Sequence, residues 1–269
     1  MKIFNLLYLG FVSIASSYSF PFNRVALKKY DDYAVNIFEP PRRFDSSYSV
    51  DNSPCLFYTG GNSDIPCEIY SSFLTKLANE NHTILVINNE IKTNYKLLEK
   101  ISENKPLTVI GHSSGSMEAL EACNNIDNIE KLILIDPVDN RLLFDKEQYN
   151  KKITLDNKLN NTLFLNARKS YKWGIFPPKM PFIPVFQFKS DKLDVPNIKT
   201  ITAKDFGHAD ILDYKWGEFM HNTFAKGLED RDVSKIDTYH SWLSKVISHF
   251  IKTGEKLDLK TVNWTNKER

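Results

Sequence analysis

The sequence of 269 residues is poor in cysteine and glycine, with 3 of the former and 10 of the latter. Three cysteines cannot supply the crosslinks of a small disulfide scaffold, and so little glycine excludes a collagen-like repeat. Hydrophobic residues make up 42% of the chain, which excludes a disordered protein and is enough for an ample core. Cys55 and Cys67 could be joined in an oxidising compartment or stay buried as thiols, and the sequence leaves both open.

The sequence also lacks a large excess of charge of either sign. Lys and Arg number 35 against 33 for Asp and Glu, which leaves a formal net charge of +2. This balance argues against a nucleic-acid partner, because such proteins bind by neutralising phosphates. No cluster with metal-ligand spacing and no cofactor motif occurs, so we predict neither a metal nor an organic cofactor. Any partner is recognised by local shape and chemistry.

No hydrophobic run reaches the about 20 residues that a helix needs to span a bilayer. The most apolar run, residues 3–15, follows a basic residue and precedes the small residues 16–19. This order is typical of a signal peptide, which we place at residues 1–19. We therefore expect the chain to enter the endoplasmic reticulum and the mature protein to be soluble.

Residues 20–30 begin with Phe20 and contain basic but no acidic side chains. A phenylalanine followed by a basic stretch after a signal peptide resembles the bipartite plastid-targeting leader of algae with secondary plastids. We predict a transit stretch here, with secretion as the alternative destination.

Short apolar runs of strand length alternate with helical stretches along the rest of the chain. Strands are predicted over residues 34–38, 55–58, 83–87, 107–110, 131–135, 162–165 and 198–201, and helices over 68–79, 94–102, 114–124 and 236–251. This order predicts the α/β class, with a mostly parallel sheet and helices on both faces. We expect one domain over residues 31–252, followed by a polar, loose tail over residues 253–269.

Residues 111–115 read GHSSG between a predicted strand and a predicted helix. A G-x-S-x-G pattern in this context is typical of a nucleophile elbow. The turn is so tight that only glycine avoids clashes on either side of the serine, which is held clear of the backbone. The sequence therefore predicts that Ser113 is a catalytic nucleophile.

An attacking serine needs donors for the negative oxygen that develops on the substrate. The N–H of Ser114, at the start of the predicted helix, is expected to be one donor. Gly61, in the loop after the strand over residues 55–58, is expected to supply the second, with Gly60 and Asn62 as alternatives.

A base and an acid complete the predicted site. Among the six histidines, His208 follows the last predicted strand, where the base of such a site belongs, whereas His112 is expected to point away from the site. Residues 166–184, where the acid often lies, contain no Asp or Glu. We therefore assign the acid to Asp136, at the tip of the preceding strand, with Asp139 as the alternative. Asp210 is too close to His208 in sequence to be preferred.

The segments GHSSG, LILIDPVDN and KDFGHADILD together resemble the chlorophyllase family, whose members show GHSRG-type, DPVDG and GHxDxLD segments. The resemblance runs from about residue 54 to 250. It implies an α/β-hydrolase-fold serine esterase that hydrolyses the phytyl ester of chlorophyll to chlorophyllide and phytol, with Asp136 as the acid. This sequence departs from the family at Ser114, where Arg is frequent, at Ser116, where Gly is found, and at Thr59, where an HG pair usually begins the loop.

Aromatic residues and prolines alternate over residues 171–188. Prolines prevent this stretch from forming a regular helix, so we predict a hydrophobic wall or lid that includes Trp173, Phe176 and Phe182, with a loop that only covers the sheet edge as the alternative. The expected partner is a lipophilic ester, reached by peripheral contact with the membrane that holds it. A general lipase, a galactolipid esterase and a non-catalytic pigment- or lipid-binding protein are the alternatives, and the sequence does not define the oligomeric state.

Overall fold

The structure is a computed structural model, and its described part covers most of the predicted domain. It comprises residues 25–30, 32–41, 53–103, 105–141, 147, 151–155, 159, 161–171, 186–223 and 231–257. The predicted signal peptide, residues 1–19, lies outside the described residues.

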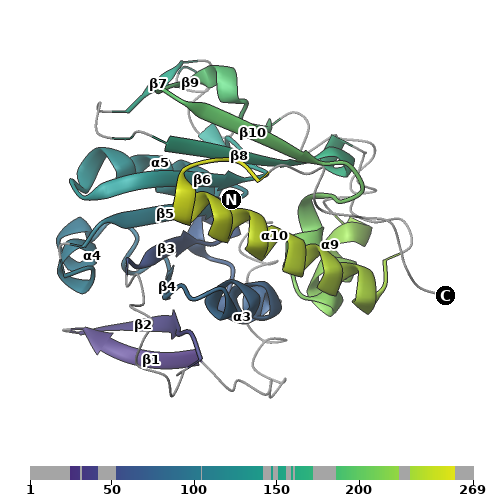
Figure 1. The fold of residues 1–269 in the computed structure, drawn as a ribbon, viewed down its shortest axis with the longest axis horizontal. Coiled ribbons are helices and arrows are strands. Elements are labelled where there is room, and N and C mark those ends of the chain that lie inside the picture. Colours follow the sequence, from purple (N-terminus) through teal and green to yellow (C-terminus); the bar gives the residue numbers. More distant parts are fainter. Residues whose placement is uncertain are drawn as a thin grey trace.

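The described residues form a large, mostly parallel sheet (Figure 1). Its eight strands are β1 (Val25–Tyr30), β2 (Tyr33–Phe38), β3 (Cys55–Tyr58), β4 (Ile84–Ile87), β5 (Leu107–His112), β6 (Ile129–Ile135), β8 (Asn161–Ala167) and β10 (Ile198–Ala203). Their order is β1-β2-β4-β3-β5-β6-β8-β10. β2 pairs antiparallel with both β1 and β4, and the other neighbouring strands are parallel. The predicted α/β class with a mostly parallel sheet is confirmed.

Helices and short turns connect these strands. The α-helices are α2 (Gly60–Ser63), α3 (Ser71–Asn79), α4 (Tyr95–Ile101), α5 (Gly115–Asn125), α9 (Tyr214–Thr223) and α10 (Val233–Thr253). The 3-10 helices are η1 (Cys67–Tyr70), η2 (Arg168–Tyr171), η3 (Ser190–Lys192) and η4 (His208–Ile211), and β7 (Ile153–Thr154) pairs with β9 (Leu193–Asp194) outside the main sheet. Within the described ranges, none of the helices is long and apolar enough to cross a membrane.

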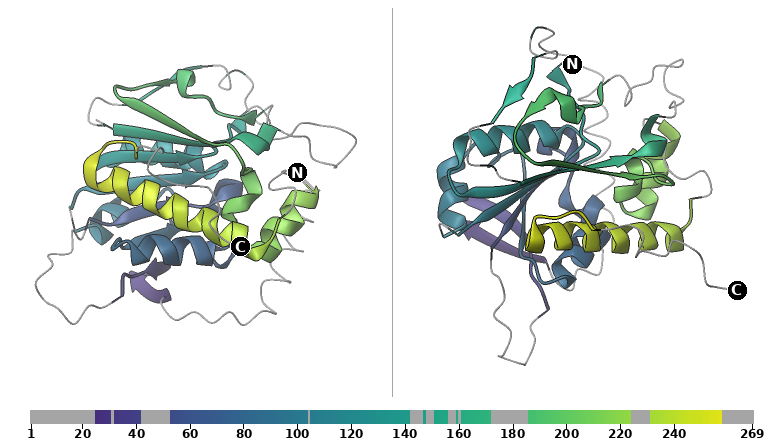
Figure 2. Two further views of the ribbon diagram at one scale, coloured as in Figure 1. Left: turned by 45° about the vertical axis from the view of Figure 1, so that its right-hand side comes forward. Right: turned by 45° about the horizontal axis from the view of Figure 1, so that its top comes forward.

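Neighbouring residues of the central strands point to opposite faces of the sheet, because side chains alternate along a strand. Phe57 and Ile110 are buried in the core on the side of α3 and α10. Leu56 and Val109, one position earlier in each strand, are buried on the side of α4 and α5. Helices therefore cover both faces, and Figure 2 shows α10 running along one side of the sheet.

Cys55 and Cys67 lie in the core on the side of α3 and α10, and no disulfide joins them. Burial raises the pKa of the Cys67 thiol, which disfavours the thiolate that reacts in disulfide exchange. The structure thus favours the second of the two possibilities that the sequence left open.

The sheet begins before residue 31, where we predicted the start of the domain. β1 pairs with β2 along its whole length, so residues 25–30 of the predicted transit stretch lie in the sheet. The sequence signal was weak because β1 lies at the sheet edge, where Leu27 is 63% exposed and a continuous apolar run is not needed. Residues 20–24 of the predicted transit stretch lie outside the described residues.

The predicted loose tail is packed at its beginning. α10 extends to Thr253, and Leu257 packs against the core on the side of α3 and α10. Lys199 on β10 donates to the carbonyl oxygen of Gly254 and pairs with Glu255 at 2.8 Å. Residues 253–257 therefore pack on the domain, and residues 258–269 lie outside the described part of the chain.

The carboxyl ends of the parallel strands meet at one edge of the sheet, which is where ligands bind in open α/β folds. The predicted site residues follow these ends: Gly61 follows β3, Ser113 and Ser114 follow β5, Asp136 follows β6, and His208 follows β10. The topology alone therefore brings together residues that are far apart in sequence.

A buried histidine on α10 supports the turn that carries His208, and it predicts a loss of stability in acid. His240 Nε2 donates to the carbonyl oxygen of Asp210 at 3.0 Å, and burial lowers the pKa of His240 to about 4. The unfolded chain, with its histidine pKa near 6.5, therefore binds more protons than the folded protein between pH 4 and 6.5. The free energy of unfolding falls as the pH falls through this window.

The variant His240→Gln tests this assignment, because glutamine keeps a hydrogen-bond donor but cannot titrate. We expect the pH dependence of its urea unfolding to be shallower than that of the unaltered protein, by up to about 1.4 kcal/mol per pH unit. Parallel curves would contradict this assignment.

Candidate active site

Ser113 lies at the tight turn between β5 and α5. Its φ of 55° is in the left-handed region, which is costly for a residue with a side chain. A Cβ on Gly111 would lie 2.6 Å from the Cα of Ser116, and one on Gly115 would lie 2.2 Å from the carbonyl oxygen of Thr59. No side chain fits at either glycine, which is the steric requirement that the elbow pattern predicts.

A chain of hydrogen bonds joins three residues from three different loops. Ser113 Oγ lies 2.9 Å from His208 Nε2, and His208 Nδ1 lies 2.6 Å from Asp136 Oδ2. His208 and Asp136 are 5% and 2% exposed, so water screens their interaction little. The structure thus brings together the hydroxyl, the imidazole and the carboxylate that the sequence singles out.

The Asp136 carboxylate has donors on both oxygens. Oδ1 accepts the backbone N–H of Ala167 at 3.0 Å, and Oδ2 accepts the Ser170 hydroxyl at 2.6 Å as well as facing His208. The φ of Asp136 is 42°, and its own N–H donates to the carbonyl oxygen of Leu165 at 2.7 Å. The segment after β8, which carries no acid itself, therefore fixes the acid that follows β6.

The alternative acid, Asp139, is engaged elsewhere. Arg141 donates to its Oδ1 from Nε at 2.8 Å and to its Oδ2 at 2.7 Å, and the Arg141 backbone N–H also donates to Oδ1 at 3.0 Å. The fork-like contact holds both oxygens of the carboxylate. Of the two candidates, Asp136 is the one that contacts the imidazole.

The GHADILD segment contains two further aspartates, Asp210 and Asp213, and neither contacts the imidazole of His208. Asp210 Oδ2 accepts the backbone N–H of Gly207 at 2.8 Å, and Arg231 Nε lies 3.6 Å from Asp210 Oδ1. Asp213 accepts the Ser71 hydroxyl at 2.6 Å at the beginning of α3. Asp210 therefore holds the backbone before His208, Asp213 ties the end of the segment to α3, and the His208 Nδ1 contact belongs to Asp136.

The expectation that His112 points away from the site is wrong. Its ring centroid lies 4.8 Å from that of His208, and its Nδ1 lies 2.8 Å from the Tyr70 hydroxyl. Burial, with a smaller contribution from the charge of His208, lowers the pKa of His112 well below its usual range. His112 is therefore neutral and packs against one side of the His208 ring. The G-x-S-x-G pattern predicts where the Ser113 side chain lies, but it contains no information on the orientation of the His112 ring.

The loop after β3 passes directly beside Ser113. A Cβ on Gly60 would lie 3.3 Å from the Cβ of Ser113. The N–H of Gly60 donates to the Tyr70 hydroxyl at 3.0 Å, and the N–H of Asn62 donates to Ser114 Oγ at 3.0 Å. Of the three candidate donors in this loop, Gly60 and Asn62 are thus engaged within the protein. Among the bonds of the described residues, none uses the N–H of Gly61 or of Ser114.

Several residues around the site have no role predicted from the sequence. They are Tyr70, Lys92, Glu118, Asn140 and Ser170, each of which contacts a predicted site residue or its neighbour. Ser170 follows β8 and Asn140 ends the DPVDN segment after β6, so the sequence alone places these two at this edge of the sheet. Tyr70, Lys92 and Glu118 come from segments that are brought next to the site only by the fold.

The predicted wall residues Trp173, Phe176 and Phe182 lie outside the described residues. The end of the same aromatic stretch is described, and there Phe188 stacks on Phe164 with ring centroids 6.2 Å apart in the core on the side of α4 and α5. The N–H of Phe188 donates to the carbonyl oxygen of Pro137 at 2.9 Å. This end of the stretch therefore covers the sheet near the turn that carries Asp136.

No family model and no curated protein matches the sequence. The structure is similar to that of an esterase from Pyrobaculum calidifontis, with a TM-score of 0.50 and 11% identity over 93% of this chain and 92% of that one. It is also similar to a ferulic acid esterase from Streptomyces cinnamoneus, with a TM-score of 0.50 and 13% identity over 91% and 92% of the two chains. Identities this low show a common architecture and leave the chemistry to be argued from the site. The chain has the α/β-hydrolase fold.

Proposed function

We propose that this protein is a serine hydrolase of carboxylic esters, with Ser113 as nucleophile, His208 as general base and Asp136 as the acid that orients it. The observation that carries the proposal is the hydrogen-bonded chain from Ser113 Oγ through His208 to Asp136, at 2.9 and 2.6 Å. This is the geometry that proton transfer from a serine hydroxyl requires, whatever the order of the residues in the sequence.

In the first step, His208 Nε2 takes the proton of the Ser113 hydroxyl while Oγ forms a bond to the ester carbonyl carbon. The electron pair of the carbonyl bond moves to its oxygen, which becomes negative. The N–H groups of Gly61 and Ser114 stabilise this oxygen, and Asp136 stabilises the charged imidazole. Ser114 also lies at the N-terminus of α5, where the helix dipole favours negative charge.

In the second step, the bond between the carbonyl carbon and the alcohol oxygen breaks, and His208 gives its proton to the departing alcohol. The acyl group stays on Ser113 Oγ. Water then attacks the acyl carbon with His208 again taking a proton, and the collapse of this intermediate returns the proton to Oγ and releases the acid.

We propose a lipophilic ester as the substrate, with the phytyl ester of chlorophyll as the specific candidate. The three segments that resemble the chlorophyllase family and the aromatic stretch over residues 171–188 support this assignment. The departures at Thr59, Ser114 and Ser116 favour a second candidate, a lipase or galactolipid esterase, because they surround the serine without altering the proposed proton transfer.

The proposed roles predict a sharp order among four variants. Ser113→Ala and His208→Ala should each reduce p-nitrophenyl butyrate hydrolysis to background. Asp136→Asn should lower kcat by about 10⁴-fold, because the amide cannot orient and stabilise the imidazolium. Asp139→Asn loses a contact with Arg141 and should lower kcat by less than about tenfold.

The order is measured as kcat for p-nitrophenyl butyrate in steady-state assays, with the fraction of folded protein determined by circular dichroism. A fluorophosphonate probe provides a control, since it should label the unaltered protein and not Ser113→Ala. Equal losses in Asp136→Asn and Asp139→Asn would refute the assignment of the acid.

The substrate is tested by incubating residues 20–269 with detergent-dispersed chlorophyll a, a galactolipid and p-nitrophenyl butyrate in parallel, with Ser113→Ala as the control. We expect chlorophyllide and phytol from the unaltered protein and neither from the variant. Cleavage of the galactolipid or the butyrate ester alone would favour the second candidate. Binding of chlorophyll without Ser113-dependent hydrolysis of any ester would instead indicate a carrier.

A further inference from the structure

The loop after β3 has an unusual backbone. Gly61, Asn62 and Ser63 have φ values of 64°, 60° and 63°, so three consecutive residues are in the left-handed region. Each such residue with a side chain costs free energy, and a run of them persists only where the surroundings hold it. Two of the three carry side chains, so the contacts that hold this loop have to be found outside it.

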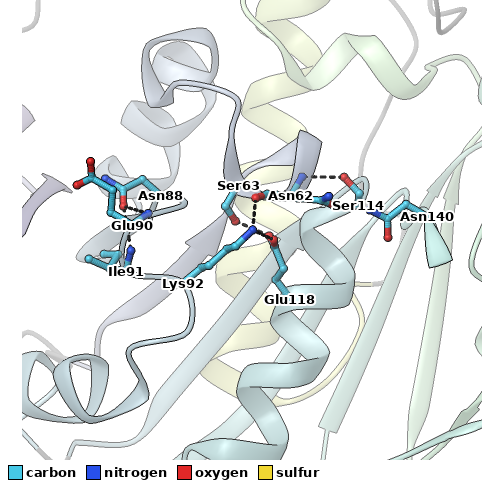
Figure 3. A network of polar contacts seen from close by, with 9 residues as sticks. All are labelled: Asn62, Ser63, Asn88, Glu90, Ile91, Lys92, Ser114, Glu118 and Asn140. Atoms are coloured by element: carbon cyan, nitrogen blue, oxygen red, sulfur yellow. Dashed lines mark hydrogen bonds and ion pairs between the residues drawn. The ribbon is translucent and has the colours of Figure 1, made fainter. Parts of the chain in front are cut away.

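The backbone N–H, the backbone carbonyl oxygen and the side-chain oxygen of Asn62 each have a partner from another segment (Figure 3). Its N–H donates to Ser114 Oγ at 3.0 Å, and its carbonyl oxygen accepts Lys92 Nζ at 2.9 Å. Its side-chain oxygen accepts the Asn140 amide at 2.5 Å. The three partners follow β5, β4 and β6, so three loops of the sheet edge converge on one residue.

A half-buried ion pair anchors this arrangement. Lys92 Nζ lies 2.7 Å from Glu118 Oε1, and Ser63 donates to the other carboxylate oxygen at 2.5 Å. The side chains of Lys92 and Glu118 are 22% and 13% exposed. Burial raises the pKa of Glu118, and the hydrogen bonds from Lys92 and Ser63 act in the opposite direction. Glu118 lies one helical turn after Ser114 on α5, so the ion pair ties the loop to the helix that begins at the elbow.

Hydrogen bonds fix the two peptide units that flank the peptide between Gly60 and Gly61. The N–H of Gly60 is held by the Tyr70 hydroxyl, and the N–H of Asn62 is held by Ser114 Oγ. The peptide between them carries the Gly61 N–H. Glycine restricts its own backbone little, so the direction of this N–H depends on these anchors and on the hydrogen bond that the carbonyl oxygen of the same peptide, that of Gly60, accepts from the Ile65 N–H at 3.2 Å.

We propose that Lys92 and Glu118 are positioning residues that hold the Asn62 backbone and so direct the Gly61 N–H toward the oxygen on which negative charge develops. Neither side chain contacts the nucleophile or the base. The inference rests on the proposed ester hydrolysis and adds to it the two residues that pre-organise the second oxyanion donor. Pre-organised donors act on the transition state more than on the bound substrate.

The test is Lys92→Met, which keeps the length of the side chain and removes its charge and donors. We expect kcat for p-nitrophenyl butyrate to fall about tenfold to a hundredfold, with KM changing less than about threefold. A trifluoromethyl ketone, which forms an oxyanion with Ser113, should bind more weakly by the same factor as kcat/KM falls. Lys92→Arg, which keeps the charge, should recover part of the loss.

Lys76→Met is the matched control, because Lys76 forms an ion pair of 2.9 Å with Asp237 between α3 and α10, and it should keep full kcat. Titration of the active sites with a fluorophosphonate gives the concentration of protein with a reactive Ser113, and kcat is calculated from this concentration for every variant. Glu118→Gln provides a second route to the same loss if Lys92→Met yields no folded protein.

Two failures are distinguishable. Unchanged kcat and unchanged ketone inhibition in both the Lys92 and the Glu118 variants, with only a lower melting temperature, would overturn the positioning role and leave the esterase intact. No Ser113-dependent hydrolysis by the unaltered protein would overturn the proposed function and this inference with it.

Discussion

The contact between Gly115 and the end of β3 is the constraint on which the site depends. Because a Cβ at Gly115 would lie 2.2 Å from the Thr59 carbonyl oxygen and 2.7 Å from that of Tyr58, the beginning of α5 and the loop after β3 touch backbone to backbone. This contact sets the distance between the elbow and the proposed oxyanion donor. A side chain at Gly115 would push the loop away from Ser113, and no rotamer of another residue could compensate.

Two residues with left-handed backbone conformations, Ser113 and Asp136, lie just after the strands β5 and β6. Backbone hydrogen bonds to the neighbouring strands hold both of them. The N–H of Ser113 donates to the carbonyl oxygen of Ile135 at 3.1 Å, and that of Asp136 donates to Leu165 at 2.7 Å. The N–H of Val138 in turn donates to the carbonyl oxygen of Ser113 at 3.0 Å. The cost of the two left-handed conformations is therefore offset by bonds between neighbouring strand ends, which also fix the serine relative to the acid.

The central strands could be predicted from the sequence because their burial on both faces imposes continuous apolar runs, as in β3 and β5. β1 could not, because the middle of this edge strand, residues 27–29, is exposed and needs no apolar pattern. In the site, Ser113 and His208 follow strands at expected positions, so motif and topology suffice to find them. Lys92 and Glu118 had no such signal, because their meeting depends on the path of the chain between β4 and α5. The orientation of His112 also depends on packing, since Tyr70 reaches it from a separate segment.

The departures from the chlorophyllase-like pattern gather around one small region. Ser114 accepts the N–H of Asn62, Ser116 donates its hydroxyl to the carbonyl oxygen of Gly111 at 3.1 Å, and the carbonyl oxygen of Thr59 lies against Gly115. Asn140, at the end of the DPVDN segment where the family has glycine, reaches the side chain of Asn62. A long Arg side chain at position 114 would not present a hydroxyl oxygen to Asn62, and a glycine at position 140 could not bond to it. Ser114 and Asn140 are therefore linked through the loop after β3, because both bond to Asn62, whereas Ser116 bonds within the elbow.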